Sequence, residues 1–383
     1  MNFFLRPLLL AAILALAGCA TDHGPKRPPF TGDPLIDGRN AIQFGPAKDK
    51  ILWQCRVAAI DLRRGDFAEA KTLLDEAIPR IGGIIANDAE ARKARQLFEG
   101  ESRKTFLGEP YERVMAYYYR GLLYWMDGEL DNARACFRSA QFQDADAGHH
   151  AYAADYVLLD YLDGYATAKL GGDGSDEWKR ARANAKNSAP PPYHTKANVL
   201  LFLEFGRGPV KWAGGRHGEQ LRFREGPPGA RSVALKLGAQ TFPLVGYDDL
   251  YYQATTRGGR VMDHILANKA VFKTTTSAVG DAALVTSAAL AGHREGEAAL
   301  AVAGLAVLSK VLSASANAQA DLRAWDNLPR HLSFAALELP PGPQTVTVDF
   351  LEAAGRLLLT KTLTFTVPAT GRDVVLFVSD RHP

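Results

Sequence analysis

Small and aromatic residues recur at helical spacing in the first half of the chain, and the clearest run covers residues 117–140. Within this run they fall at fixed offsets: Tyr117, Gly121, Tyr124, Gly128, Ala133, Phe137 and Ala140. A period near 3.6 residues on both sides of a glycine predicts two antiparallel helices joined by a tight turn near Gly128. Gly121 and Ala133 are small enough to let the helices interlock. The aromatic side chains of residues 117–125 are expected to pack in the core rather than bind a ligand.

These offsets resemble those of a tetratricopeptide repeat (TPR), a pair of helices that stacks on neighbouring pairs. Tyr117 stands where the repeat usually has tryptophan, and Arg120 where it usually has leucine. Weaker copies of the pattern are found at residues 58–77, and a third helical pair is expected within 151–187. The pattern therefore predicts a TPR-like α-helical domain over residues 49–187.

After three consecutive prolines at 190–192, the pattern changes to short β-type runs separated by glycine and proline. Strands are expected at residues 198–205, 220–223, 232–237 and 251–256, and four more alternating runs follow within 332–378. Alternation of apolar and polar residues indicates a sheet with one buried face. Strands from the two groups are expected to share one sheet.

An alanine-rich helical insertion, residues 261–320, separates the two groups of strands. Its apolar run, residues 298–308, is shorter than the roughly 18 residues that a membrane-spanning helix needs. The expected fold class is thus α+β and multidomain. The TPR-like helical domain is followed by a small antiparallel β domain, built from residues 197–260 and 330–383, which the insertion interrupts.

Residues 1–18 have the pattern of a signal peptide, with Arg6 before an apolar run that is too short to span a bilayer. The run ends in Leu-Ala-Gly-Cys19, which resembles the lipobox of bacterial lipoproteins. That resemblance implies cleavage before Cys19 and acylation of its thiol, whereas the alternative is an ordinary signal peptide or membrane anchor with a chance cysteine. Ala20, in place of aspartate, favours the outer membrane, with the protein on its periplasmic face. Residues 19–48 are rich in proline and are expected to form an extended tether.

Composition excludes one class of partner. The 383 residues have a formal charge of +3, and no basic stripe with interleaved aromatics is present, so nucleic acid is not expected to bind. Cys55 and Cys136 fall inside predicted helices, where buried thiols are expected. A disulfide between them stays open, because it requires Cα atoms within about 7 Å.

Three stretches could carry chemistry, and each has a simpler interpretation. A group of glutamates within residues 98–113 has arginine and lysine beside it, which favours salt bridges and capping over acid–base catalysis: Glu99, Glu101, Glu109 and Glu112. His149 and His150 are adjacent, so on a helix they would point about 100° apart and not ligate one ion together. Residues 206–209 lack the Gly-Lys-Ser/Thr of a phosphate loop. No catalytic residue, metal site or cofactor is therefore predicted.

Three motifs together resemble the uncharacterised TPR lipoproteins of Gram-negative bacteria: FLGEPYER at residues 106–113, ADLRAWDNLP at 320–329 and LPPG at 339–342. The resemblance covers most of the chain that follows the signal peptide. It implies the fold and the membrane address, but no activity.

The function expected from these features is that of a scaffold or adaptor. It is held on the membrane by lipid on Cys19 and binds another cell-envelope protein through its TPR-like helices. An alternative is a carrier of lipid or a small molecule, with a cavity between the sheet and the alanine-rich insertion. A second alternative, a hydrolase acting on peptidoglycan, would need a nucleophile and base or a metal set, and neither Gly-x-Ser-x-Gly nor His-Glu-x-x-His occurs.

Overall fold

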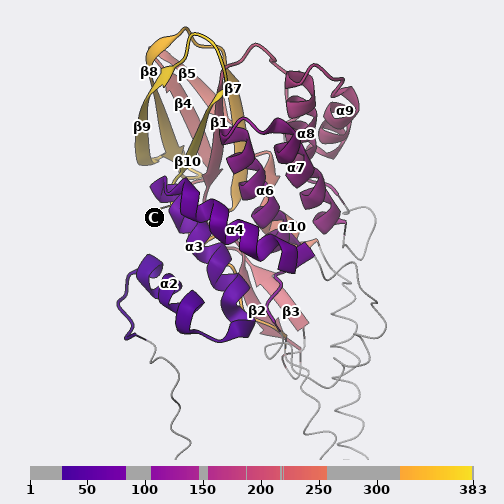
Figure 1. Ribbon diagram of the computed structural model, residues 1–383, viewed down its shortest axis with the longest axis vertical. Coiled ribbons are helices and arrows are strands. Elements are labelled where there is room, and N and C mark those ends of the chain that lie inside the picture. The colour runs from indigo at the N-terminus through magenta and orange to yellow at the C-terminus, as the bar shows by residue number, and fades with distance from the viewer. Residues whose placement is uncertain are drawn as a thin grey trace, which may run out of the picture.

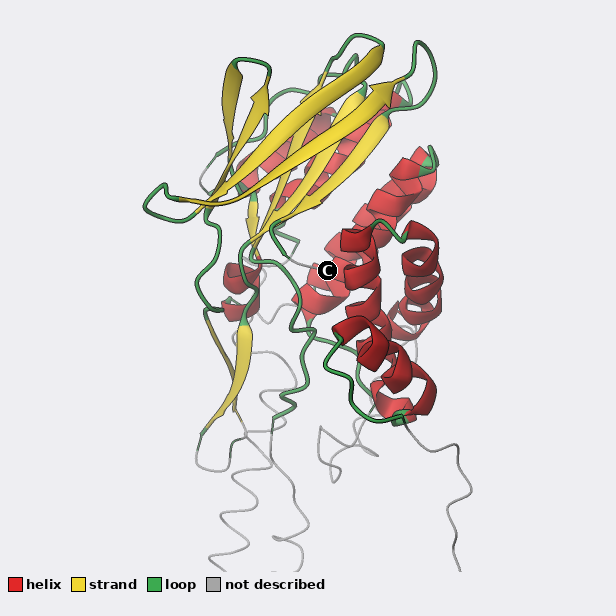
Figure 2. Cartoon of the chain, turned by 90° about the vertical axis from the view of Figure 1, so that its left-hand side faces the viewer, coloured by secondary structure: helices red, strands yellow, loops and turns green. Residues whose placement is uncertain are grey.

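Helices fill the N-terminal half of the described chain and strands the C-terminal half, in three layers (Figure 1). The computed structural model describes residues 28–82, 105–145, 154–186, 188–215, 218, 220–256 and 320–381. One sheet lies on the outside, a second sheet lies behind it, and the helices cover the far face of the second sheet (Figure 2). The signal peptide, Cys19 and residues 257–319 of the insertion lie outside the described residues.

The helical half is a series of hairpins in which each described helix packs against the next. Its elements are α2 (Pro34–Phe44), the 3-10 turn η1 (Ala47–Asp49), α3 (Lys50–Arg64), α4 (Phe67–Gly82), α6 (Pro110–Met126), α7 (Leu130–Asp144), α8 (Val157–Lys169) and α9 (Ser175–Asn184). The three helical pairs that the sequence predicts are therefore present. Each pair turns at a glycine with positive φ, Gly65 (85°), Gly128 (78°) or Gly171 (83°). Glycine adopts this conformation without the steric cost that other residues pay.

Helix α2 corrects the prediction that residues 19–48 form an extended tether, which was wrong from Pro34 onward. Asp33 accepts hydrogen bonds from the backbone of Leu35 and Ile36, and Pro34 occupies the first helical turn. An aspartate N-cap and a proline at the first position both favour a helix start. The buried side chain of Leu35 belongs to the core shared with α3 and α4. The prolines that suggested an extended chain therefore begin a packed helix.

Asp61 is a buried carboxylate on α3 at the junction with α2 and α4. Its side chain is fully buried, and neither oxygen accepts a hydrogen bond. The guanidinium of Arg39 lies 3.7 Å away and donates instead to Glu69. Burial, together with the negative charge of Glu69, raises the pKa of Asp61 to about 7.

We expect the buried carboxyls to make the folded protein less stable as pH rises from about 4 to about 7, against the opposite effect of the buried His331 imidazole, whose pKa is lowered to about 4. A carboxyl whose pKa is raised by folding binds its proton more tightly in the folded state, so its contribution is present at low pH and is lost through this window. Asp160 and Asp248, whose pKa values burial raises to about 6 and about 7, act in the same direction. Thermal unfolding across this pH range should show a smaller slope for Asp61→Asn than for the unchanged protein. Asp131→Asn, at an exposed site, should leave the slope unchanged, and an unchanged slope in Asp61→Asn would refute the assignment.

Within the described part of the chain, the strands form two four-stranded sheets and a ribbon. The inner sheet has the order β10-β1-β7-β6, the outer sheet β5-β4-β8-β9, and the ribbon pairs β2 with β3. The strands are β1 (Val199–Phe205), β2 (Val210–Gly214), β3 (Gln220–Arg224), β4 (Ser232–Leu237), β5 (Gln240–Leu244), β6 (Asp248–Asp249), β7 (His331–Leu337), β8 (Gly342–Leu351), β9 (Leu357–Val367) and β10 (Val374–Ser379). Strands from before and after the insertion pair with one another, β1 with β7 and β10, and β4 with β8. The prediction that they share a sheet is confirmed.

Two details of the β prediction were wrong. The pairing of β1 with β10 is parallel, so the inner sheet is mixed rather than antiparallel. Residues 251–256, predicted as a strand, belong to the short helix α10 (Leu250–Thr255). The carboxylate of Asp249 caps this helix by accepting from the backbone N–H groups of Tyr251 and Tyr252. A local cap therefore overrides the β preference of the two tyrosines.

Strand β1 joins the helices to the sheets because both of its faces are buried. Leu200 and Phe202 belong to the core that includes the helices. Leu201 and Leu203 belong to the core between the two sheets. The helices before the proline-rich boundary at residues 188–197 thus pack on one face of β1, and the outer sheet, which is formed from residues after this boundary, packs on the other face. None of the helices within the described ranges is long and apolar enough to cross a membrane.

Candidate functional site

The residues that the repeat pattern singles out hold α6 against α7. A Cβ on Gly121 would lie 2.7 Å from the ring of Phe137, so only glycine allows this approach of the two helices. Ala133, Phe137 and Ala140 are fully buried on α7. Gly128 forms the turn, as predicted. Tyr124 is half-buried, and the guanidinium of Arg120 lies 3.5 Å from its ring centre.

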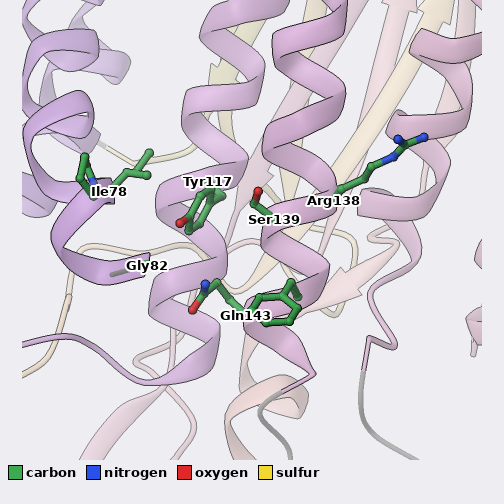
Figure 3. A pocket seen from close by; sticks show the side chains of 8 residues that line it. Ile78, Gly82, Tyr117, Arg138, Ser139 and Gln143 are labelled. Carbon is green, nitrogen blue, oxygen red and sulfur yellow. The ribbon is translucent and has the colours of Figure 1, made fainter. Parts of the chain in front are cut away.

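Tyr117 has a different environment, because it lines a groove of about 480 Å³ between α4, α6 and α7 (Figure 3). The lining residues are Ile78, Pro79, Gly82, Tyr117, Arg138, Ser139, Phe142 and Gln143. In Figure 3 the Tyr117 ring stands between Ile78 on α4 and Ser139 on α7. The prediction of core packing holds for Tyr118, Tyr119 and Trp125, which are fully or almost fully buried. The half-buried rings of Tyr117 and Tyr124 pack against the same core, and Tyr117 also faces the groove.

The walls of the groove are mainly apolar. Ile78 and Pro79 form one side, and the ring of Phe142, 59% exposed, forms another. A cluster of this kind suits an apolar side chain from a binding partner. Because Pro79 lies within α4 and has no N–H, it leaves one backbone carbonyl of the helix without its usual partner.

Polar groups in the groove are few and specifically placed. A Cβ on Gly82 would lie 2.5 Å from the Tyr117 hydroxyl, so glycine makes room for this hydroxyl. Burial raises the pKa of Tyr117, which therefore stays protonated and can donate a hydrogen bond. The Arg138 side chain points away from Tyr117 (Figure 3) and donates to Asp163 of α8 at 2.7 Å. Its charge is thereby paired outside the groove.

Glu112 is a buried carboxylate that connects three segments. Its Oε2 accepts from the Lys211 ammonium of β2 at 2.7 Å, and its Oε1 from the Trp325 backbone N–H at 2.7 Å. The same carboxylate completes a capping box with Glu109 at the start of α6. The interpretation of this glutamate as capping and salt bridging is confirmed. The pairing also brings together the motifs at residues 106–113 and 320–329, which are far apart in the sequence.

Glu204 is another buried carboxylate that joins helices to strands, and no motif or spacing in the sequence predicts this role. It projects from β1 toward the helices and accepts from Arg63 Nε of α3 at 2.7 Å and from the Tyr119 hydroxyl of α6 at 2.5 Å. Ser379 of β10 donates to it at 2.7 Å. Both Glu112 and Glu204 are saturated with internal donors, and their role is to fasten the helical layer to the strands.

The remaining predicted sites can be placed only in part. Cys55 is buried and Cys136 half-buried, and both are free thiols. Burial raises the pKa of Cys136 to about 11, so it stays protonated near neutral pH. Glu99, Glu101, His149, His150 and the acylation site Cys19 lie outside the described residues. Among those that are described, no group of three or more His, Cys, Asp or Glu side chains is placed to hold a metal ion.

Comparison with known proteins found no relative: no family model, no curated protein and no solved structure matches this chain. The resemblance to TPR lipoproteins therefore remains a prediction from its motifs.

Proposed function

We propose that this protein is a lipid-anchored scaffold on the periplasmic face of the outer membrane, which binds another cell-envelope protein through TPR-like helices. Three consecutive helical hairpins with glycine turns support the TPR-like assignment. The close contact at Gly121 supports it further, because small residues at such positions let paired helices interlock. Lipid on Cys19 would provide the anchor.

The groove between α4, α6 and α7 is the observation that carries the binding role. It combines an exposed phenylalanine, an aliphatic wall and the hydroxyls of Tyr117 and Ser139, and the charge of Arg138 is paired with Asp163 of α8. A partner that inserts an apolar side chain next to Phe142 would bury these surfaces. A peptide carbonyl near Tyr117 could accept a hydrogen bond from the Tyr117 hydroxyl. The alternative of a lipid carrier rests on a cavity beside the alanine-rich insertion, residues that the structure does not describe.

Replacing Phe142 with aspartate should abolish capture of the partner while leaving the fold intact. The charge would have to be desolvated in the apolar contact, whereas in the free protein it stays in water. We expect chemical cross-linking in intact cells, followed by mass spectrometry, to recover one envelope protein with the unchanged chain and at least tenfold less of it with Phe142→Asp, the loss that about 1.4 kcal/mol or more would cause.

Leu170→Asp is the matched control, because Leu170 is similarly exposed (48%) at the end of α8, outside the groove. It should keep the cross-link. Equal recovery with both variants would show that binding does not use the groove. Bound lipid in the purified protein, with no cross-linked protein, would favour the carrier.

A further inference from the structure

A second groove, of about 440 Å³, lies between the start of α3, strand β2 and the segment 322–326. It is at the end of the molecule where α2 and the β2–β3 ribbon are found (Figures 1 and 2). Trp53 lines it from α3, the helix that packs against α2. Leu322 also lines it and is 46% exposed. The groove thus lies between α3, the ribbon and the segment 322–326.

The outer face of the ribbon continues this surface. Residues two apart on a strand share a face, so Val210 in the groove and Trp212 beyond it point the same way. Their cross-strand partners are Arg224 and Arg222, which are exposed, and Trp212 itself is 44% exposed. This face therefore combines tryptophan and arginine, and strands β2 and β3 contain no acidic residue.

The charges along the groove itself are paired. Arg56 lies 3.0 Å from Asp326, and Arg323 lies 2.6 Å from both Asp49 and Asp321. Lys211 is buried against Glu112. Among the described residues, the groove therefore adds no positive charge, and the positive charge of this surface is that of Arg222 and Arg224 on the ribbon, which complements an anionic surface.

The position of the acylation site limits how far this surface can be from a bilayer. Cys19 is nine residues before Pro28, the first described residue, and nine extended residues span at most about 32 Å. Helix α2 begins six residues after Pro28. An acyl anchor on Cys19 therefore keeps the α2 end of the molecule close to the membrane, and the groove lies on α3, which packs against α2.

We propose that the face formed by Trp53, Val210, Trp212, Arg222, Arg224 and Leu322 lies on an anionic phospholipid surface. Tryptophan favours the membrane–water interface, and arginine near the surface is attracted to acidic headgroups. The inference rests on the proposed anchor, since Cys19 supplies the first attachment and this face the second. Contact of this kind fixes the orientation of the scaffold and leaves the groove at α4, α6 and α7 open to a partner. A protein that binds the same face is the competing occupant.

Tryptophan quenching by brominated lipid tests the proposal directly. The acylated full-length protein is reconstituted into vesicles of phosphatidylethanolamine and phosphatidylglycerol with brominated acyl chains. We expect the fluorescence to be quenched, and the quenching to be lost for the most part in a Trp53→Phe, Trp212→Phe double variant. Trp178→Phe is the control, because Trp178 lies on α9, where its indole donates to the Pro191 carbonyl. Quenching that is absent, or unchanged in the double variant, would overturn the proposal.

A second measurement distinguishes membrane binding by this face from membrane binding by the acyl anchor. Cys19→Ala expressed without residues 1–18 has neither an acyl chain nor the N-terminal apolar segment, so any binding of this variant to the same vesicles in a sedimentation assay comes from the protein surface. Adding Arg222→Gln or Arg224→Gln should weaken that binding about fivefold each, and Arg182→Gln on α9 should not change it.

If mass spectrometry shows no acyl chain on the mature protein while this pattern holds, the anchor is wrong and the face stands. If the acylated protein binds vesicles but the arginine variants have no effect, the anchor stands and the face is wrong. Loss of an envelope-protein cross-link in the arginine variants, with vesicle binding unchanged, would assign the face to a protein instead.

Discussion

Replacing Glu204 with leucine is expected to lower the free energy of unfolding by about 3–5 kcal/mol. The side chains of Glu204 and Arg63 are 0% and 1% exposed, and they form an ion pair of 2.7 Å between β1 and α3. Removing the carboxylate leaves the guanidinium buried without a counter-charge, and the Tyr119 and Ser379 hydroxyls lose their acceptor. Denaturant unfolding, followed by circular dichroism, measures the effect.

Two further variants make this prediction specific. Glu225→Leu also removes a carboxylate that pairs with two arginines, but this one is exposed, and it should cost about 1 kcal/mol or less. The double variant Glu204→Leu, Arg63→Leu should recover much of the lost stability, because it leaves no unpaired buried charge. A loss below about 1 kcal/mol for Glu204→Leu would mean that this ion pair does not fasten the two layers.

Replacing Cys19 with alanine should move nearly all of the protein from the membrane fraction to the soluble periplasm. Each buried methylene contributes about 0.8 kcal/mol, so two or three acyl chains hold a protein on the bilayer almost permanently. The ribbon face alone offers only a few interfacial side chains and gives weak, salt-sensitive attachment. Fractionation of cells, with immunodetection of the protein, measures the distribution.

Cys55→Ala serves as the control, since Cys55 is a buried thiol in α3 and takes no part in attachment. It should stay with the membrane. Retention of Cys19→Ala in a membrane pellet washed with carbonate would contradict acylation and would indicate that the N-terminal apolar segment is retained as the anchor.

The helical hairpins could be predicted because their signals are local. A glycine at each turn and small residues at the contacts are found within about 25 residues of one another, as at Gly121 and Gly128. The long strands were also predictable, because their apolar residues alternate or run continuously. The strands β2, β5 and β6 were missed, although β3, which is as short as β2 and β5, was predicted. Pro243 within β5 argues against a strand, and the two residues of β6 are too few for a period to be recognised.

Two predictions of secondary structure were wrong because residue composition was weighted above the signals for helix N-caps. The prolines before α2 suggested an extended tether, and the tyrosines of α10 suggested a strand. In both cases an aspartate directly before the element, Asp33 or Asp249, accepts hydrogen bonds from the first backbone N–H groups. An Asp-Pro pair is a recognisable helix start, so the first of these could have been found in the sequence.

The long-range partners of the buried carboxylates could not have been predicted from the sequence. Glu204 lies in an apolar strand and pairs with Arg63, which is 141 residues away. Glu112 was expected to form local contacts, and its pairing with Lys211 spans 99 residues. Nothing in the spacing of either residue indicates its partner, because the chain fold brings them together. The groove at Phe142 has the same origin, since α4, α6 and α7 each contribute only part of its wall.

We propose that the groove between α4, α6 and α7 binds an envelope protein while lipid on Cys19 holds the scaffold on the membrane. The most direct test places a photo-crosslinking amino acid at position 142 in living cells, with position 170 as the control site. We predict one light-dependent adduct with a specific envelope protein, in the membrane fraction, from position 142 and not from position 170. No adduct from position 142, or the same set of adducts from both positions, would contradict the account.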